Sequence, residues 1–180
     1  MIETRRLRLV SLGPAVLRAS LAGRREESEK LLAASLPGDW PDTQDLRHVL
    51  VMRLADLRAR PDNEPWLSRV VTLRDDARVV GLTGFHGPPG GEWLCDFAPE
   101  GVEFGYSIFE PDRRQGFAFE ASEALIAWAS AEHRVRDFVL SIAPDNVPSA
   151  RLAAKLGFQR VGHWHHAVRG LEHVHRRTLD

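Results

Sequence analysis

The chain contains very little sulfur and almost no net charge: 180 residues with one cysteine, two methionines and a formal net charge of −1. The single cysteine, Cys95, excludes an intramolecular disulfide. A nearly neutral chain has no electrostatic reason to bind nucleic acid or an acidic membrane surface. No run approaches the roughly 20 apolar residues that a membrane-spanning helix needs, and Met1–Arg6 lacks the apolar core of a signal peptide. We expect a cytoplasmic monomer or homodimer without nucleic-acid or membrane partners.

The hydrophobic content of 43% and the length indicate one globular domain, residues 1–180, large enough to bury a core. Apolar residues alternate in some segments and recur at helical spacing in others. The predicted strands are Arg6–Val10, Trp66–Leu73, Val79–Phe85, Val102–Ile108, Phe138–Ile142, Gln159–Val168 and Leu171–Thr178. Helices are predicted in Pro14–Ala34 and Thr43–Arg60, from Gly116 onward, and within Asp145–Phe158. This order predicts an α/β (α+β) fold with a central mixed, mostly antiparallel sheet of about seven strands flanked by helices.

The most informative stretch is Val102–Glu120, where a strand leads through a glycine-containing loop directly into a helix. Alternation places Val102 and Phe104 on the buried face of the strand and Glu103 on the other face. The loop Arg113–Ala118 then lies at a helix N-terminus, where free amides and the helix dipole favour an anion. Gly116 would let a phosphate approach closely. An ordinary tight strand–helix connection is the alternative.

A second segment, Asp145–Phe158, follows another apolar strand and predicts a short helix. Asn146 can cap its N-terminus, Leu152 and Leu156 form its inner stripe, and Gly157 can end it.

Five segments occur in a fixed order: ETRRLRL at Glu3–Leu9, VVGLTGFHG at Val79–Gly87, VEFGYSI at Val102–Ile108, RRQGFAFEA at Arg113–Ala121 and DNVPSARLAAKLGF at Asp145–Phe158. Together they resemble the GNAT superfamily of acyl-CoA-dependent N-acyltransferases, and within it the RimJ/RimL-like branch. The loop fits the superfamily pattern Q/R-x-x-G-x-G/A through Arg113, Gly116 and Ala118. The resemblance implies transfer of an acetyl group from acetyl-CoA to a primary amine of a small molecule or protein N-terminus, in a ternary complex and without a metal.

The resemblance also implies where CoA binds: the loop holds the pyrophosphate, a splayed strand pair leaves main-chain groups free, and Asn146 bonds the pantetheine arm. Asn146 could instead only cap its helix. Arg114, Arg151 and Lys155 could bind CoA phosphates or could be solvated surface charges. The predicted CoA-binding residues are Tyr106, Ser107, Ile108, Arg113, Arg114, Gln115, Gly116, Phe117, Ala118, Asn146, Ser149 and Arg151.

A protonated amine acceptor must lose a proton before it attacks a thioester, and Glu103 is the predicted general base. We expect partial burial to raise its pKa toward a useful value. The alternative is a glutamate that is solvated or paired with an arginine. A backbone amide near Tyr106 and Ser107 is the predicted donor to the oxyanion of the tetrahedral intermediate.

The resemblance to RimL-like proteins suggests that Ser149 protonates the departing CoA sulfur, and capping of its helix is the alternative. Many other GNAT enzymes use a tyrosine one turn later in this helix. This chain has Ala153 there, and its single tyrosine is Tyr106, so the tyrosine mechanism is excluded.

Several residues have a second interpretation. Cys95 lacks a neighbouring base in the sequence, so a role as acyl-carrying nucleophile is disfavoured. Trp40 with its neighbouring aspartates could attract a cationic amine, although a capped, solvated helix start is the simpler interpretation. Five histidines near the end could form a cluster across a hairpin, but a pH-sensitive or substrate-contacting surface is favoured over a metal site. They are His163, His165, His166, His173 and His175.

The residues are compatible with a protein N-terminus, an antibiotic, an amino acid or a polyamine as the acceptor amine. A non-catalytic domain that binds CoA would need the loop Arg113–Ala118 and Asn146 but not Glu103, so it remains the alternative function.

Overall fold

The computed structural model describes residues 1–180, apart from the side chain of Gln44. The chain divides into two compact units. The first comprises Met1–Gly84 with Tyr106–Ala121, and the second comprises Phe85–Gly105 with Ser122–Asp180.

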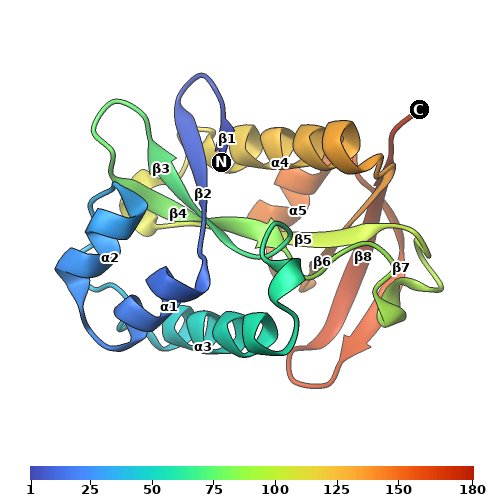
Figure 1. The fold of residues 1–180 in the computed structure, drawn as a ribbon. Helices are drawn as coiled ribbons and strands as arrows, with labels where there is room; N and C mark the ends of the chain where they lie inside the picture. The colour runs from blue at the N-terminus through green and yellow to red at the C-terminus, as the bar shows by residue number, and fades with distance from the viewer. The chain divides into compact units, whose positions relative to one another are not determined.

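Four strands pair consecutively in the first unit, and all of these pairs are antiparallel. Figure 1 shows three helices packed together beneath these strands. The strands are β1 (Ile2–Glu3), β2 (Leu7–Ser11), β3 (Arg69–Leu73) and β4 (Val79–Phe85), and the helices are α1 (Pro14–Leu21), α2 (Arg25–Leu32) and α3 (Gln44–Ala59). The core between helices and strands includes Leu17, Leu50 and Val70, none of which is exposed.

Local signals explain where these helices begin and end. Pro14 starts α1, since its fixed φ suits the first helical position. Gly23 follows α1 with φ +70°, a conformation that glycine adopts without strain, so the segment predicted as one helix is divided into α1 and α2. The side chain of Thr43 caps α3 by accepting a hydrogen bond from the Leu46 amide.

In the second unit, the first part of β5 (Val102–Ile108) pairs in parallel with β6. β6 pairs with β8, and β8 with β7, in antiparallel fashion. The elements are β6 (Asp137–Ile142), β7 (Gln159–His166), β8 (Gly170–Thr178), α5 (Val147–Lys155) and a short 3-10 turn, η2 (Glu92–Leu94). The strand β5 and the helix α4 (Phe117–His133) both continue from one unit into the other.

The strand order is β1-β2-β3-β4-β5-β6-β8-β7 in an eight-stranded sheet. The predicted mixed, mostly antiparallel α/β fold is therefore confirmed, with eight strands in place of about seven because Ile2–Glu3 forms a short strand of its own. The predicted splaying of a strand pair around CoA stays a prediction.

The alternation predicted for β5 is wrong at one important residue. Val102, Glu103 and Phe104 are all buried, while Tyr106 is only half-buried. Glu103 lies opposite Val139 of β6, and Leu94 and Ala98 pack on Val139, so this face of the strand is covered as well. A period of two cannot show that the segment carrying Leu94 and Ala98, fewer than ten residues earlier in the chain, covers the second face.

Candidate active site

The predicted pyrophosphate loop joins η3 (Glu110–Asp112) to α4 in the first unit. Arg114 and Gly116 have φ of +63° and +81°. The amide of Glu120 donates to the Gly116 carbonyl, which is the first bond of the helix. The amides of Phe117 and Ala118 precede that bond, and such amides at a helix N-terminus suit an anion.

Arg6 of the β1–β2 connection fastens this loop. Its Nη1 donates to the Gln115 carbonyl at 2.9 Å, and its Nε lies 2.6 Å from Glu120 Oε2. The guanidinium also lies 4.7 Å from the centre of the Phe117 ring. Burial alone would raise the pKa of Glu120, but hydrogen bonds from Thr4 and from the Arg6 backbone and side chain lower it. Sequence reasoning missed the roles of Arg6 and Glu120, although both lie within the segments ETRRLRL and RRQGFAFEA that carry the family resemblance.

Further contacts fix the preceding turn. The Nε of Arg113 donates to the Ile108 carbonyl at 2.9 Å. Arg78 donates to both oxygens of the buried Asp112, at 2.7 and 2.9 Å. A Cβ on Gly81 would lie 2.2 Å from the Ser107 carbonyl oxygen, so only glycine fits beside this part of β5. The predicted residues Tyr106 to Ala118 are thus all brought together in the first unit.

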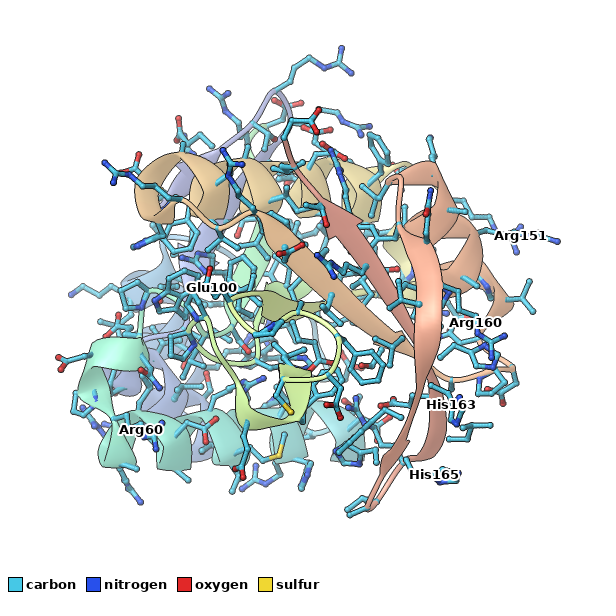
Figure 2. All side chains as sticks on the ribbon, turned by 90° about the vertical axis from the view of Figure 1, so that its right-hand side faces the viewer. Arg60, Glu100, Arg151, Arg160, His163 and His165 are labelled. Carbon is cyan, nitrogen blue, oxygen red and sulfur yellow. The ribbon has the colours of Figure 1, made fainter. Side chains whose placement is uncertain are left out.

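In the second unit, Asn146 caps α5: its Oδ1 accepts a hydrogen bond from the Ser149 amide at 3.2 Å. The side-chain oxygen that caps this helix is therefore that of Asn146. Asn146 is exposed and Ser149 is half-buried in the first turn. Arg151 is exposed and projects outward from α5 (Figure 2).

The predicted base Glu103 has a partner that the sequence did not reveal. His86 Nδ1 lies 2.7 Å from Glu103 Oε2, and the His86 amide donates to the Glu103 carbonyl at 2.9 Å. The Glu103 side chain is 6% exposed and that of His86 is 33% exposed. A Cβ on Gly105 would lie 3.1 Å from His86 Nε2, so the glycine leaves room for the imidazole. This pair joins a buried carboxylate to an imidazole that solvent can reach.

The expected rise in the pKa of Glu103 is wrong. Burial acts to raise this pKa, but the charge of His86 and its hydrogen bond, together with Ser141 and the charge of Arg169, lower it below its ordinary value. Glu103 is therefore a carboxylate at neutral pH and is well suited to orient the imidazole. The partner of Glu103 is thus a histidine, which neither alternative, a solvated glutamate or one paired with an arginine, had named, and the predicted role of Glu103 as general base stays a prediction.

The sequence matches the acetyltransferase (GNAT) domain over residues 6–159. The chain belongs to this family. Over 160 residues it is 27% identical to the uncharacterized N-acetyltransferase YjdG of Bacillus subtilis (strain 168), covering 88% of this chain and 89% of that protein. An acetyltransferase from Agrobacterium tumefaciens str. C58 has a similar fold, with a TM-score of 0.65, 21% identity, and 99% and 94% of the two chains covered.

RimL, a ribosomal L7/L12 alpha-N-protein acetyltransferase solved in complex with coenzyme A, also shares the fold. Its TM-score is 0.62 at 17% identity, and the comparison covers 98% of this chain and 96% of that one. Structural neighbours of this GNAT protein thus include ribosomal-protein acetyltransferases, consistent with the RimJ/RimL-like branch.

The C-terminal histidines lie on the hairpin β7–β8. His163 is directly opposite His173, and Figure 2 shows His163 and His165 projecting outward from β7. Among the described side chains, no group of three or more histidine, cysteine, aspartate or glutamate residues could hold a metal ion. The described helices likewise include none long and apolar enough to cross a membrane.

Trp40 is not available to a ligand. It is 5% exposed, packs in the core of the first unit, and donates its indole N–H to Ser20 Oγ at 3.0 Å. The cation-attracting role considered for Trp40 and its aspartates is therefore wrong, and the capped helix start is the correct interpretation. Cys95 is exposed.

Proposed function

We propose that this GNAT protein transfers an acetyl group from acetyl-CoA to a primary amine of a small molecule or protein N-terminus, by direct attack in a ternary complex. Residues 1–180 act as one catalytic domain. Family membership, the N-acetyltransferase relatives and the CoA complex of RimL support the donor and the reaction. The observation that carries the chemistry is the contact of 2.7 Å between His86 and the buried Glu103.

This pair can remove the proton that keeps an amine from reacting. A lysine-type amine has a reference pKa of about 10.4, so at neutral pH it is almost entirely protonated. An imidazole has a reference pKa of about 6.5, in the range useful to a base at that pH. Glu103 accepts the Nδ1 proton of His86 and so leaves Nε2 as the atom that accepts the proton of the amine. His86 is then the catalytic residue and Glu103 the positioning residue.

Acetyl-CoA binds through residues of both predicted segments. The pyrophosphate lies on the amides of Arg114–Ala118, and Asn146 bonds the pantetheine arm, with Arg151 near a phosphate. The amine nitrogen attacks the thioester carbonyl and forms a C–N bond, while an amide near Tyr106 and Ser107 stabilises the oxyanion. When the C–S bond breaks, Ser149 orients or protonates the CoA sulfur.

A panel of primary amines with acetyl-CoA tests this function. CoA release is followed with a thiol reagent, and mass spectrometry identifies the acetylated amine. We expect release that depends on the amine and one acetyl group on each product molecule. Tight CoA binding without acetylation of any amine would support the non-catalytic alternative and contradict the proposal.

Because Asn146 supplies the cap of α5, the two residues give separable predictions. Ser149→Ala should lower kcat by about 10- to 100-fold, less than the loss of a committed acid–base group. Asn146→Ala should lower the free energy of unfolding by about 1 kcal/mol, the usual value of an N-cap. Thermal unfolding and kcat measured on both variants check this; a Ser149→Ala protein with full turnover would remove Ser149 from the mechanism.

A further inference from the structure

The strand β7 lies at one end of the sheet, and its only partner among the described strands is β8. It is eight residues long, and none of these residues is buried. An edge strand directs the N–H and C=O groups of every second residue away from the sheet, where they can pair with another strand. The second unit therefore has a long edge that can accept a further strand.

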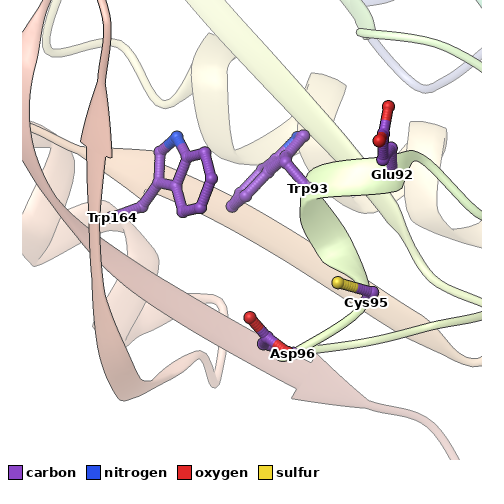
Figure 3. Close-up of a pocket in the computed structure, with 5 residues that line it drawn as sticks. All are labelled: Glu92, Trp93, Cys95, Asp96 and Trp164. Atoms are coloured by element: carbon purple, nitrogen blue, oxygen red, sulfur yellow. The ribbon is translucent and has the colours of Figure 1, made fainter.

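One face of β7 is covered by the segment that precedes β5. Figure 3 shows Trp164 of β7 beside Trp93 of this segment, and the two ring systems have centres 5.6 Å apart. At Gly162, two residues earlier in β7, a Cβ would lie 2.8 Å from the Phe97 ring. Successive side chains of a strand point to opposite faces, so the alternate residues of β7 lie on the second face. These alternate residues are the exposed ones.

The exposed face carries basic side chains in opposite pairs. Arg160 lies opposite His175, and His163 lies opposite His173. Opposite residues of a sheet have their side chains about 5 Å apart on one face, and like charges there repel. Burial lowers the pKa of His175, and the charges of His173 and Arg160 lower it further. With the exposed His165, two residues beyond His163, these five side chains form what we call the basic face.

The basic face has little acid around it. None of its five members forms an ion pair within the residues that the structure describes. β7 contains no aspartate or glutamate, and the single acid of β8, Glu172, is buried on the covered face. The charged side chains of the neighbouring elements are Asp145 before α5, Arg151 and Lys155 of α5, and the ion pair of Arg177 with Glu123. Bases thus outnumber acids here, which matches an anionic partner.

We propose that the edge of β7 binds an extended acidic segment of a partner protein as an additional strand. Acidic side chains at alternate positions of that segment would lie beside His163 and His165, with Arg160 farther along the edge. Main-chain hydrogen bonds supply affinity in this mode of binding, and the basic face supplies the selection for acids. A second copy of the chain is a poor occupant, because pairing β7 with β7 would bring basic residues together. The proposal does not depend on acetyl transfer.

An octapeptide that alternates glutamate and threonine tests this proposal by calorimetric titration. Its ends are acetylated and amidated, so it offers no amine to acetylate. It should bind in a saturable manner at pH 6, and a peptide with glutamine in place of glutamate should bind at least about tenfold more weakly. Affinity should fall from pH 6 to pH 8, because imidazoles with a reference pKa of about 6.5 lose their charge while the glutamates stay ionised. A peptide methylated on every backbone nitrogen keeps its charges but lacks the donors, and it should not bind measurably.

Protein variants assign the binding to this edge. Replacing both His163 and His165 with glutamine should remove most of the pH dependence, and Arg160→Gln should weaken binding at both pH values. Arg136→Gln changes an exposed arginine of the same unit outside the hairpin and should keep native affinity. Equal binding of the glutamate, glutamine and methylated peptides, or no binding of any, would overturn the proposal. Self-association of the protein that the acidic peptide disperses would assign the edge to a second copy and overturn it as well.

Discussion

Replacing Glu103 with glutamine should lower the kcat of amine acetylation by about 10²- to 10⁴-fold, the range found when acid–base catalysis is lost. A glutamine keeps the shape of the side chain but removes the charge that orients His86 across the contact of 2.7 Å. The Kd of CoA should stay within about twofold, because the predicted pyrophosphate loop does not include this residue. Initial rates and calorimetric titration with CoA measure the two effects.

The same variant should show a distinct pH dependence. Only the deprotonated amine attacks, so the residual rate of Glu103→Gln should rise with pH as more of the acceptor loses its proton without help. The native protein should lose its rate advantage over Glu103→Gln in acid. The pKa of Glu103 is lowered in the fold, so the charge of Glu103 stabilises the native protein above its unfolded pKa of about 4.3, and this contribution is lost as pH falls through the folded value. The charges of His86 and Arg169 lower the pKa of Glu103 and so determine the pH range over which this contribution is lost.

Glu100→Gln is the matched control, since Glu100 is an exposed carboxylate three residues earlier in the same segment. It should retain native rates at every pH. A Glu103→Gln protein as fast as the native one at neutral pH would remove Glu103 from the mechanism.

Replacing Gly116 with valine should weaken CoA binding by at least about tenfold, equivalent to about 1.4 kcal/mol. Gly116 has φ +81°, where a β-branched residue is strained. A Cβ there would also occupy space beside the amides that are proposed to bind the pyrophosphate. A Cβ there would also come within 3.4 Å of Arg6 Nη2, the side chain that fastens the loop. Calorimetric titration with CoA measures the effect.

Backbone strain alone needs its own control. Gly23 has φ +70° and no atom within 4 Å of an added Cβ, so Gly23→Val imposes a similar strain away from the loop. Its free energy of unfolding should fall while the Kd of CoA stays near the native value. Equal CoA affinity in Gly116→Val and native protein would exclude this loop as the pyrophosphate site.

Local features of the chain predicted much of the fold. Asn146 and Gly157 mark the ends of α5, and the change of period at Gly116 marks the start of α4, because caps, glycine conformations and apolar spacing act within a few residues. The division of the first helical segment at Gly23 could also have been anticipated from its glycine.

Features that depend on tertiary packing could not be predicted in this way. The burial of Glu103 results from Leu94 and Ala98, which cover its face of the sheet. His86 is 17 residues from Glu103, and its role becomes visible only when the chain just after β4 lies beside β5, where the His86 amide donates to the Glu103 carbonyl. The acidic neighbours of Trp40 do not reveal its burial, because its indole N–H bonds to Ser20 inside the core.

A double-mutant cycle on His86 and Glu103 tests the central claim most directly. The kcat of amine acetylation is measured at neutral pH for native protein, His86→Asn, Glu103→Gln and the double variant. If the carboxylate acts through the imidazole, the double variant should be no slower than the slower single variant, because the second change removes a group that has already lost its function. Full turnover in His86→Asn, or losses that multiply in the double variant, would contradict proton transfer through this pair.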